Sequence, residues 1–312
     1  MCTDVNIFLG ADMMHSFDSN SFYKNCNLCA RGCGVDRTGG ERGFCGASNI
    51  PAIARAALHM WEEPIISGSL GSGTIFFRGC SIGCVFCQNS EISSRVEGGS
   101  VSPEQLASIM LGLEQKGAHN INFVTPTHFT PSIVEAIELA KVRGLSIPIV
   151  YNTGSYDRVE TIRLLDGFVD IYLPDYKYYR SSTAMAYSSA PDYPEVAFSA
   201  IEQMVRQRPN VVIQDGLIKE GVIIRLLLLP SHVAEAKLAL KRLYSAFGNS
   251  VYYSLMSQYT PMPNMLPPLD REVTQAEYRE LVDYADRLGI INAFIQDKSS
   301  SGELYIPEFD IK

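Results

Sequence analysis

The chain has 312 residues, enough for one large domain with a small appendage. Its formal net charge of −8 argues against nucleic acid as a partner, because phosphate binding needs clustered Lys and Arg and the sequence has no basic stripe. No apolar run reaches the roughly 18 residues of a membrane span, and no charged and apolar leader precedes Lys24, so we expect a cytoplasmic protein without a membrane partner.

The cysteines are concentrated in the first third of the chain. All eight lie at or before position 87, and Cys2 stands apart from the other seven. A disulfide framework is typical of a small secreted domain, whereas gaps of two and three residues direct several thiolates at one metal centre. We therefore predict metal ligation for the seven clustered cysteines and none for Cys2, which lies in a segment to Tyr23 that we expect to be irregular.

The first cysteine set lies in a Gly-rich segment, at about residues 24–48, that cannot build a hydrophobic core. Four thiolates saturate either a tetrahedral zinc ion or a [4Fe–4S] cluster, and the sequence leaves both metals open. A saturated centre takes no further ligand, so we expect a structural or electron-transfer role. The set consists of Cys26, Cys29, Cys33 and Cys45.

From about Ser72 the pattern changes to alternating strands and helices. Six short, apolar runs are typical of a parallel sheet that is covered on both faces. Because a closed eight-fold barrel needs about 250 residues by itself, we predict an α/β fold with an open, partial (β/α)6 barrel. We expect an N-terminal extension (1–70) and a core domain (71–312) with a C-terminal helix and tail. The predicted strands are 74–78, 121–124, 147–151, 169–173, 222–229 and 251–256, and the predicted helices start at Pro103 or cover 131–141, 157–165, 194–207, 232–247 and 274–288.

The second cysteine set, Cys80-x3-Cys84-x2-Cys87, follows the first predicted strand directly. Parallel sheets place their chemistry at the carboxyl ends of strands. Three thiolates can hold three irons of a [4Fe–4S] cube, and without a fourth cysteine nearby the last iron is open to an external ligand. The alternative is a zinc site that takes its fourth ligand from elsewhere in the chain.

The three cysteines, the aromatic Phe86 before the last of them and the βα array resemble the radical S-adenosylmethionine (SAM) superfamily. This resemblance implies an oxidoreductase that binds SAM at the open iron of a [4Fe–4S] cluster. It further implies reductive cleavage of SAM to methionine and a 5′-deoxyadenosyl radical, which removes a hydrogen atom from the substrate. A reductant such as flavodoxin or ferredoxin is the implied electron donor.

Five longer stretches resemble uncharacterised relatives of pyruvate formate-lyase activating enzyme, and the resemblance extends over about residues 24–290. It implies a glycyl-radical enzyme as a protein substrate. Another protein, a peptide or a small molecule is the alternative, and a non-catalytic iron–sulfur electron carrier is the alternative of a different class. The stretches are 73–80, 87–93, 120–128, 149–154 and 170–177.

The same resemblance implies SAM contacts at the strand ends. Activating enzymes carry a Gly-Gly-Glu motif after the second strand, where this chain has Thr125-Pro126-Thr127-His128, so the Thr125 hydroxyl is the expected substitute for the missing carboxylate. A histidine that these enzymes often place near the last strand is also absent from residues 257–261. The implied cofactor-binding residues are Phe86, Thr125, Asn152, Asp175, Lys177 and Arg225.

Three polar residues in these stretches and strands also have simpler interpretations. His128 is either an acid–base group or a hydrogen-bonded loop histidine. Asn152, in the turn Asn152-Thr153-Gly154, either contacts SAM or only shapes the turn. Arg225 lies within an apolar strand, where an unpaired charge is expensive, so we expect it to bind a carboxylate, with a structural ion pair as the alternative.

Overall fold

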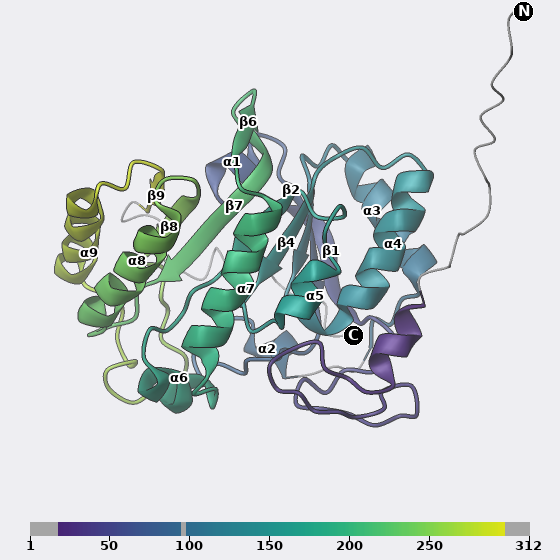
Figure 1. Ribbon diagram of the computed structural model, residues 1–312, viewed down its shortest axis with the longest axis horizontal. Helices are drawn as coiled ribbons and strands as arrows, with labels where there is room; N and C mark the ends of the chain where they lie inside the picture. The colour runs from purple at the N-terminus through teal and green to yellow at the C-terminus, as the bar shows by residue number, and fades with distance from the viewer. Residues whose placement is uncertain (1–17, 95–97, 297–312) are drawn as a thin grey trace, which may run out of the picture.

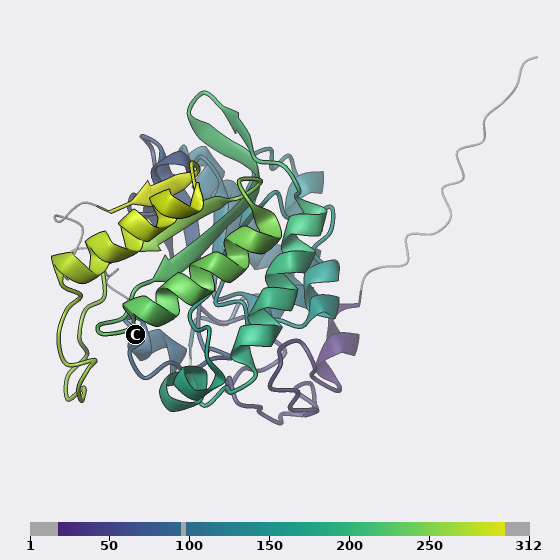
Figure 2. The ribbon, with the colours of Figure 1, turned by 60° about the vertical axis from the view of Figure 1, so that its left-hand side comes forward.

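The computed structural model describes residues 18–94 and 98–296 of the chain. One curved sheet runs through the molecule, and helices α4, α5, α7 and α8 cover one of its faces (Figure 1). Helix α9 packs beside α8 at the end of this layer (Figure 2). Among the described residues, no helix is both long and apolar enough to cross a lipid bilayer.

The strand order of the sheet is β1-β2-β3-β4-β5-β7-β8-β9, and β6 pairs with β7 outside this path. Strands β2, β3, β4, β5, β7, β8 and β9 are mutually parallel, whereas β1 is antiparallel to β2 and β6 is antiparallel to β7. The strands are Ile53–His59 (β1), Ser72–Phe77 (β2), Ile121–Val124 (β3), Ile149–Thr153 (β4), Ile171–Pro174 (β5), Val212–Gln214 (β6), Leu217–Leu227 (β7), Tyr252–Met256 (β8) and Ala293–Ile295 (β9).

The helices begin where the sequence supplies caps. Ser102 and Gln105 form a capping box at the start of α3, and Thr274 and Glu277 form another at the start of α9. The helices are η1 (Ser19–Tyr23), α1 (Pro64–Ser67), α2 (Ser90–Ser93), α3 (Pro103–Gln115), η2 (Thr127–Phe129), α4 (Thr130–Val142), α5 (Val159–Arg163), α6 (Ser181–Ser188), α7 (Tyr193–Gln207), α8 (Val233–Phe247) and α9 (Gln275–Leu288), of which η1 and η2 are 3-10 helices.

The predicted fold class is confirmed. All six predicted strands are present in the predicted parallel array, and every residue of β2, β4 and β5 is buried, as expected for a sheet covered on both faces. The sequence did not predict β1, β6 and β9, which extend or flank the array. The expectation of an irregular lead-in to Tyr23 is wrong for its last five residues, because Asp18 caps the short helix η1 with its side chain.

The sheet has a weak seam between β5 and β7. These strands pair regularly at only two positions, Ile171 with Gly221 and Tyr172 with Val222. Pro174 has no N–H group to donate at the next part of the ladder. Pairing resumes at an isolated bridge between Asp175 and Arg225.

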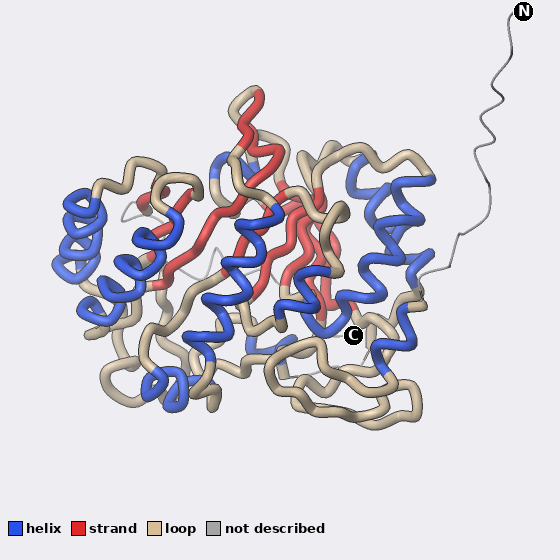
Figure 3. Tube along the Cα trace, in the orientation of Figure 1, coloured by secondary structure: helices blue, strands red, loops and turns tan. Residues whose placement is uncertain are grey.

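The Cys-rich segment crosses the carboxyl end of the sheet as loops and turns (Figure 3). It is attached by main-chain contacts, such as the bridge between Cys29 and Asp157, and by the side chains of Arg31 and Arg37. The fully buried Arg37 donates from Nη1 to the carbonyl oxygen of His128 at 2.7 Å, and its guanidinium lies 4.4 Å from the ring centroid of Tyr23. The segment therefore relies on polar and cation–π contacts more than on an apolar core of its own.

Candidate active site

A cavity of about 820 Å³ lies inside the partial barrel. The loop after β2 brings Cys80, Cys84 and Cys87 to its wall, and the ends of β4 and β5 contribute Asn152 and Asp175. The three thiols are free and partly exposed. The structure thus places the second cysteine set at the carboxyl ends of the parallel strands, as the sequence predicts.

Backbone geometry fixes the cysteine loop against the sheet. Gly83 adopts a positive φ of +70°, which a side chain would strain. Gly154 at the end of β4 approaches the loop so closely that a Cβ atom there would lie 2.2 Å from Cδ1 of Ile82. The N–H of Ile82 lies 3.3 Å from the Cys80 sulfur and donates to it. Substitution of either glycine would therefore displace the loop.

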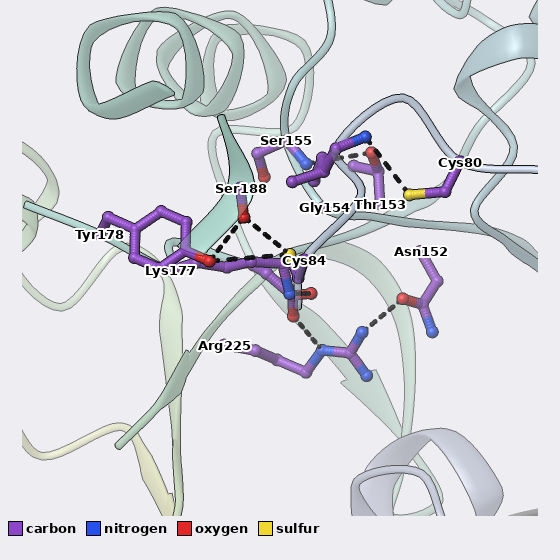
Figure 4. A network of polar contacts seen from close by, with 12 residues as sticks. Cys80, Cys84, Asn152, Thr153, Gly154, Ser155, Lys177, Tyr178, Ser188 and Arg225 are labelled. Carbon is purple, nitrogen blue, oxygen red and sulfur yellow. Dashed lines mark hydrogen bonds and ion pairs between the residues drawn. The ribbon is translucent and has the colours of Figure 1, made fainter. Parts of the chain in front are cut away.

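An aromatic and hydroxyl shell surrounds Cys84. The Ser188 hydroxyl lies 3.1 Å from the Cys84 sulfur and the Tyr178 hydroxyl lies 3.7 Å from it, and Figure 4 shows both groups directed at this atom. Phe86, which is buried, lies edge-on to Tyr178 at a ring-centroid distance of 6.4 Å. Such donors stabilise negative charge on sulfur, so the shell suits a thiolate ligand.

The chemistry of the thiols fits an iron–sulfur cluster. Burial raises the pKa of Cys80 to about 12, and the nearby Cys84 and Cys87 raise it further because three thiolates would repel one another. The three thiols would be deprotonated as ligands of iron, whose positive charge would offset this repulsion. Among the described residues, no three His, Cys, Asp or Glu side chains converge as the ligands of a single metal ion would. A cubane cluster instead takes its thiolates at separate irons.

A chain of charged residues links the cysteine loop to the interior of the cavity. Lys177 Nζ lies 2.6 Å from Asp175 Oδ2, and Arg225 Nε lies 2.9 Å from Asp175 Oδ1. Burial opposes ionisation of Asp175, but Lys177 and Arg225 outweigh it and hold the pKa of this carboxyl below its usual range. Arg225 also donates to the Asn152 side-chain oxygen (Figure 4). Four of the predicted cofactor-binding residues therefore form one network.

Arg225 is engaged within the protein itself. Besides Asp175, its Nη1 lies 3.2 Å from Glu62 Oε2, so the alternative interpretation as a structural ion pair describes its contacts. Sequence reasoning missed Glu62 and its neighbour Glu63, which both line the cavity from the loop between β1 and α1. The only sequence signal for them was two adjacent acidic residues before a proline that starts a helix. They were missed because they lay in the predicted extension and not at the end of a predicted strand.

Thr125 and His128 have different positions although they are close in sequence. Thr125 lines the cavity with a φ of 56°, an outlying conformation for a β-branched residue. His128 is buried behind the wall, where its Nε2 lies 2.7 Å from the carbonyl oxygen of Arg78. Its contacts are those of a hydrogen-bonded loop histidine, and it is not among the residues that line the cavity.

The first cysteine set packs directly on the cluster loop. Burial raises the pKa of Cys29 to about 12, and Cys45, Cys26 and Cys33 add to it through like-charge repulsion, so the four sulfurs share one region. Arg31, between these cysteines in sequence, donates to the carbonyl oxygens of Ser81 and Ile82 on the cluster loop at 3.0 and 2.8 Å. The two cysteine sets are therefore neighbours.

Comparisons with known proteins agree with this geometry. The model of the Radical SAM superfamily matches residues 74–219, which include Cys80, Cys84 and Cys87. An uncharacterized protein of Methanocaldococcus jannaschii is 28% identical over 281 residues, and the match covers 87% of this chain and 77% of the relative.

One solved structure shares the fold, and two others match more weakly. A radical SAM methyltransferase from Sphaerobacter thermophilus has a TM-score of 0.51 and 13% identity, over 72% of this chain and 66% of that chain. Native anSMEcpe with bound AdoMet and Kp18Cys peptide has a TM-score of 0.48 and 12% identity, over 67% and 57% of the two chains. Streptococcus suis SuiB bound to S-adenosylmethionine has a TM-score of 0.48 and 10% identity, over 70% and 48%. This chain spans about half to two thirds of their lengths.

The structure is an open α/β barrel with three free thiols in the loop after its first parallel strand. The family match makes the assignment specific: residues 74–219 form a domain that matches the radical SAM superfamily. A radical SAM domain implies a [4Fe–4S] cluster and SAM as cofactors, and the prediction of both from the sequence is confirmed. The presence of a second metal centre stays a prediction.

Proposed function

We propose that Cys80, Cys84 and Cys87 hold a [4Fe–4S] cluster at the mouth of the cavity and that the chain uses it for hydrogen abstraction from a substrate. The observation that carries the proposal is the cavity itself, whose wall contains three free thiols and a partly buried charged network. A non-catalytic electron carrier has no use for such a cavity. When bound, the cluster and SAM supply the 5′-deoxyadenosyl radical.

The residues of the chain hold the cluster, orient SAM and exclude water from the cavity. Ser188 and Tyr178 donate hydrogen bonds to the Cys84 sulfur, which stabilises its thiolate form. Lys177 and Asn152 present a cation and an amide at the cluster end of the cavity, where they suit the carboxylate and hydroxyl groups of SAM. The packed rings around Phe86 keep water from the cluster loop.

The finer assignments are proposals or predictions. We propose a second centre at Cys26, Cys29, Cys33 and Cys45, supported by their mutual proximity, and the division of the chain at residue 70, although β1 of the extension joins the sheet. Modification of a peptide or a small molecule is the proposed reaction class. A glycyl-radical enzyme as substrate, flavodoxin or ferredoxin as reductant and a cytoplasmic location stay predictions.

The test is anaerobic reconstitution with iron and sulfide, followed by dithionite and SAM, with 5′-deoxyadenosine as the measured product. Wild type and Cys2→Ala, which alters the cysteine outside both sets, are expected to cleave SAM, and Cys80→Ala is expected to fall to background. A Cys26→Ser/Cys29→Ser variant is expected to lose iron or zinc but to keep the iron of the other set. If wild type with a reduced cluster releases no 5′-deoxyadenosine, the proposal is wrong.

A further inference from the structure

The cavity continues from the cysteine loop to the amino end of the sheet. Because β1 and β2 are antiparallel, His59 lies opposite Ser72 at the start of β2, whereas Cys80 follows the end of that strand. Both His59 and Cys80 line the cavity, which therefore runs along the whole of β2, roughly 17 Å at about 3.3 Å per residue. The end remote from the cysteines is lined by Trp61, Glu62 and Glu63.

The charges of the cavity wall do not balance. Among the described residues that line it, three carboxyl groups face two cationic side chains, and the five residues are Glu62, Glu63, Asp175, Lys177 and Arg225. Lys177 pairs with Asp175, and Arg225 pairs with Asp175 and Glu62. Glu63 is the carboxyl group left without an ion pair in the described part of the chain.

Glu63 is also incompletely hydrogen-bonded. The residue is 8% exposed, the Ser254 side chain and the residue's own backbone N–H bond its carboxyl group, and its Oε2 atom has no partner among the described residues. A buried carboxylate oxygen without a donor costs free energy, so the position calls for an explanation. Burial raises the pKa of Glu63, Arg225 only partly offsets it, and Glu62 adds repulsion.

A second orphaned acceptor is buried behind the cavity wall, on a residue that contacts Glu62 but does not itself line the cavity. Asn122 on β3 is fully buried, and its Nδ2 donates to Glu62 Oε1 at 2.9 Å, which fixes the orientation of the amide. Its Oδ1 then has no hydrogen-bond partner in the described structure. Both unpartnered atoms are acceptors. An ammonium or guanidinium group carries several donors, no acceptor and a positive charge, so it suits this region, whereas an anion would be repelled.

We infer that the end of the cavity remote from the cysteines recognises a cationic group of the substrate, an ammonium or a guanidinium, through the carboxyl group of Glu63. This inference rests on the proposed function, because it takes the cavity as the place where substrate meets the radical. Glu62 is tied to Arg225 and Asn122 and forms the rigid wall beside Glu63. Neutral and anionic compounds of the same shape are discriminated against.

The test compares 1,5-diaminopentane with 1,5-pentanediol, which match in length but differ in charge. Binding to the reconstituted holoenzyme in the presence of SAM is measured by anaerobic calorimetry. Wild type is expected to prefer the diamine at least tenfold. Glu63→Gln is expected to reduce this preference at least tenfold, and Glu63→Asp, which keeps the charge on a shorter side chain, is expected to reduce it less.

Glu235→Gln is the matched control. Glu235 is also a buried glutamate, but it accepts from the backbone N–H groups of Tyr179 and Arg180 and from the Thr183 hydroxyl, outside the cavity. Its substitution is expected to lower the Tm of the holoenzyme without SAM at pH 8 and to leave the diamine preference intact. Glu63→Gln is expected to raise this Tm, because it removes an uncompensated buried charge.

Three results would overturn the inference. The first is equal binding of diamine and diol by wild type, and the second is a Tm for Glu63→Gln that falls as it does for Glu235→Gln. The third is a loss of SAM affinity in Glu63→Gln as large as the loss of diamine affinity, since the carboxyl group would then serve SAM. Calorimetry does not depend on turnover, so failure of wild type to release 5′-deoxyadenosine would count against the proposed function alone.

Discussion

His128 lies behind the cavity wall, where burial is the main cause, and Arg37 a second, of a pKa lowered to about 3. The Arg78 carbonyl accepts from its Nε2, so Nε2 carries the hydrogen, and Nδ1 is buried without a partner among the described residues. Protonation would therefore place a charge where nothing receives it. The residue acts in the structure as a neutral donor, not as an acid–base group.

The low pKa of His128 makes stability depend on pH. The unfolded state takes up a proton as the pH falls through about 6.5, whereas the folded state does so only near pH 3, so the free energy of unfolding falls over this range. At pH 5.5 the loss is about 1.4 kcal/mol relative to pH 7.5. We expect urea unfolding of His128→Gln to show a smaller loss than wild type between these pH values. Equal losses in the two proteins would contradict this prediction.

Sequence reasoning at the residue scale found the side chains that follow strands and missed those that precede a helix. Asp175 and Lys177 could be predicted because the resemblance to activating enzymes implies SAM contacts at the carboxyl ends of the parallel strands, which are a fixed place for chemistry. Glu62 could not, because its contact with Arg225 joins residues 163 positions apart. Nothing local in the sequence marks such a pair.

At the scale of elements, Arg31 connects three parts of the molecule. Its guanidinium donates to Ser81 and Ile82 on the cluster loop and to Ser188 and Ser189 at the end of α6. The spacing of the cysteines predicts a metal-binding segment, but not how it docks. The contacts of Arg31 with backbone carbonyl groups could not be predicted. Every residue has a carbonyl group, and nothing in the sequence indicates which of them accept from this arginine.

Arg31→Lys is expected to loosen the cluster loop, because a lysine cannot reproduce the fork of donors. Hydrogen bonds from a charged group contribute about 1.5–3 kcal/mol each, so we expect SAM-cleaving activity to be lost to an iron chelator about tenfold faster than in wild type. Arg42→Lys is the control, because Arg42 is exposed and donates only to the adjacent Glu41 carbonyl in the described structure. Equal rates for the two variants would show that Arg31 does not hold the loop.

At the scale of the whole molecule, Arg225 connects the two halves of the sheet. It lies on β7, pairs across the seam with Asp175 at the end of β5, and reaches Glu62 in the loop after β1. The sequence predicted the parallel array because its strands are apolar runs separated by helices. The edge strands β1 and β9 escaped prediction because one precedes the array in the Cys-rich extension and the other has only three residues.

Arg225→Met keeps a long side chain but leaves two partly buried carboxyl groups without this cation. We expect the free energy of unfolding to fall by about 3–5 kcal/mol, measured by urea titration of the reconstituted protein. Arg206→Met is the matched control, because Arg206 pairs with Glu202 on the exposed face of α7 and the loss there is expected to stay below about 0.5 kcal/mol. A loss in Arg225→Met no larger than in the control would argue against a central role for the network.

The short pairing between β5 and β7 gives the sheet a line about which its two halves can hinge. The half of the sheet from β1 to β5 carries both cysteine sets. The half from β7 to β9 carries Leu227, Ser254 and Met256 of the cavity wall. A small rotation about this line would change the width of the cavity without breaking any strand pair within either half. Hydrogen exchange of the amide protons nearest Pro174 should therefore report most directly how far the two halves of the sheet have rotated apart.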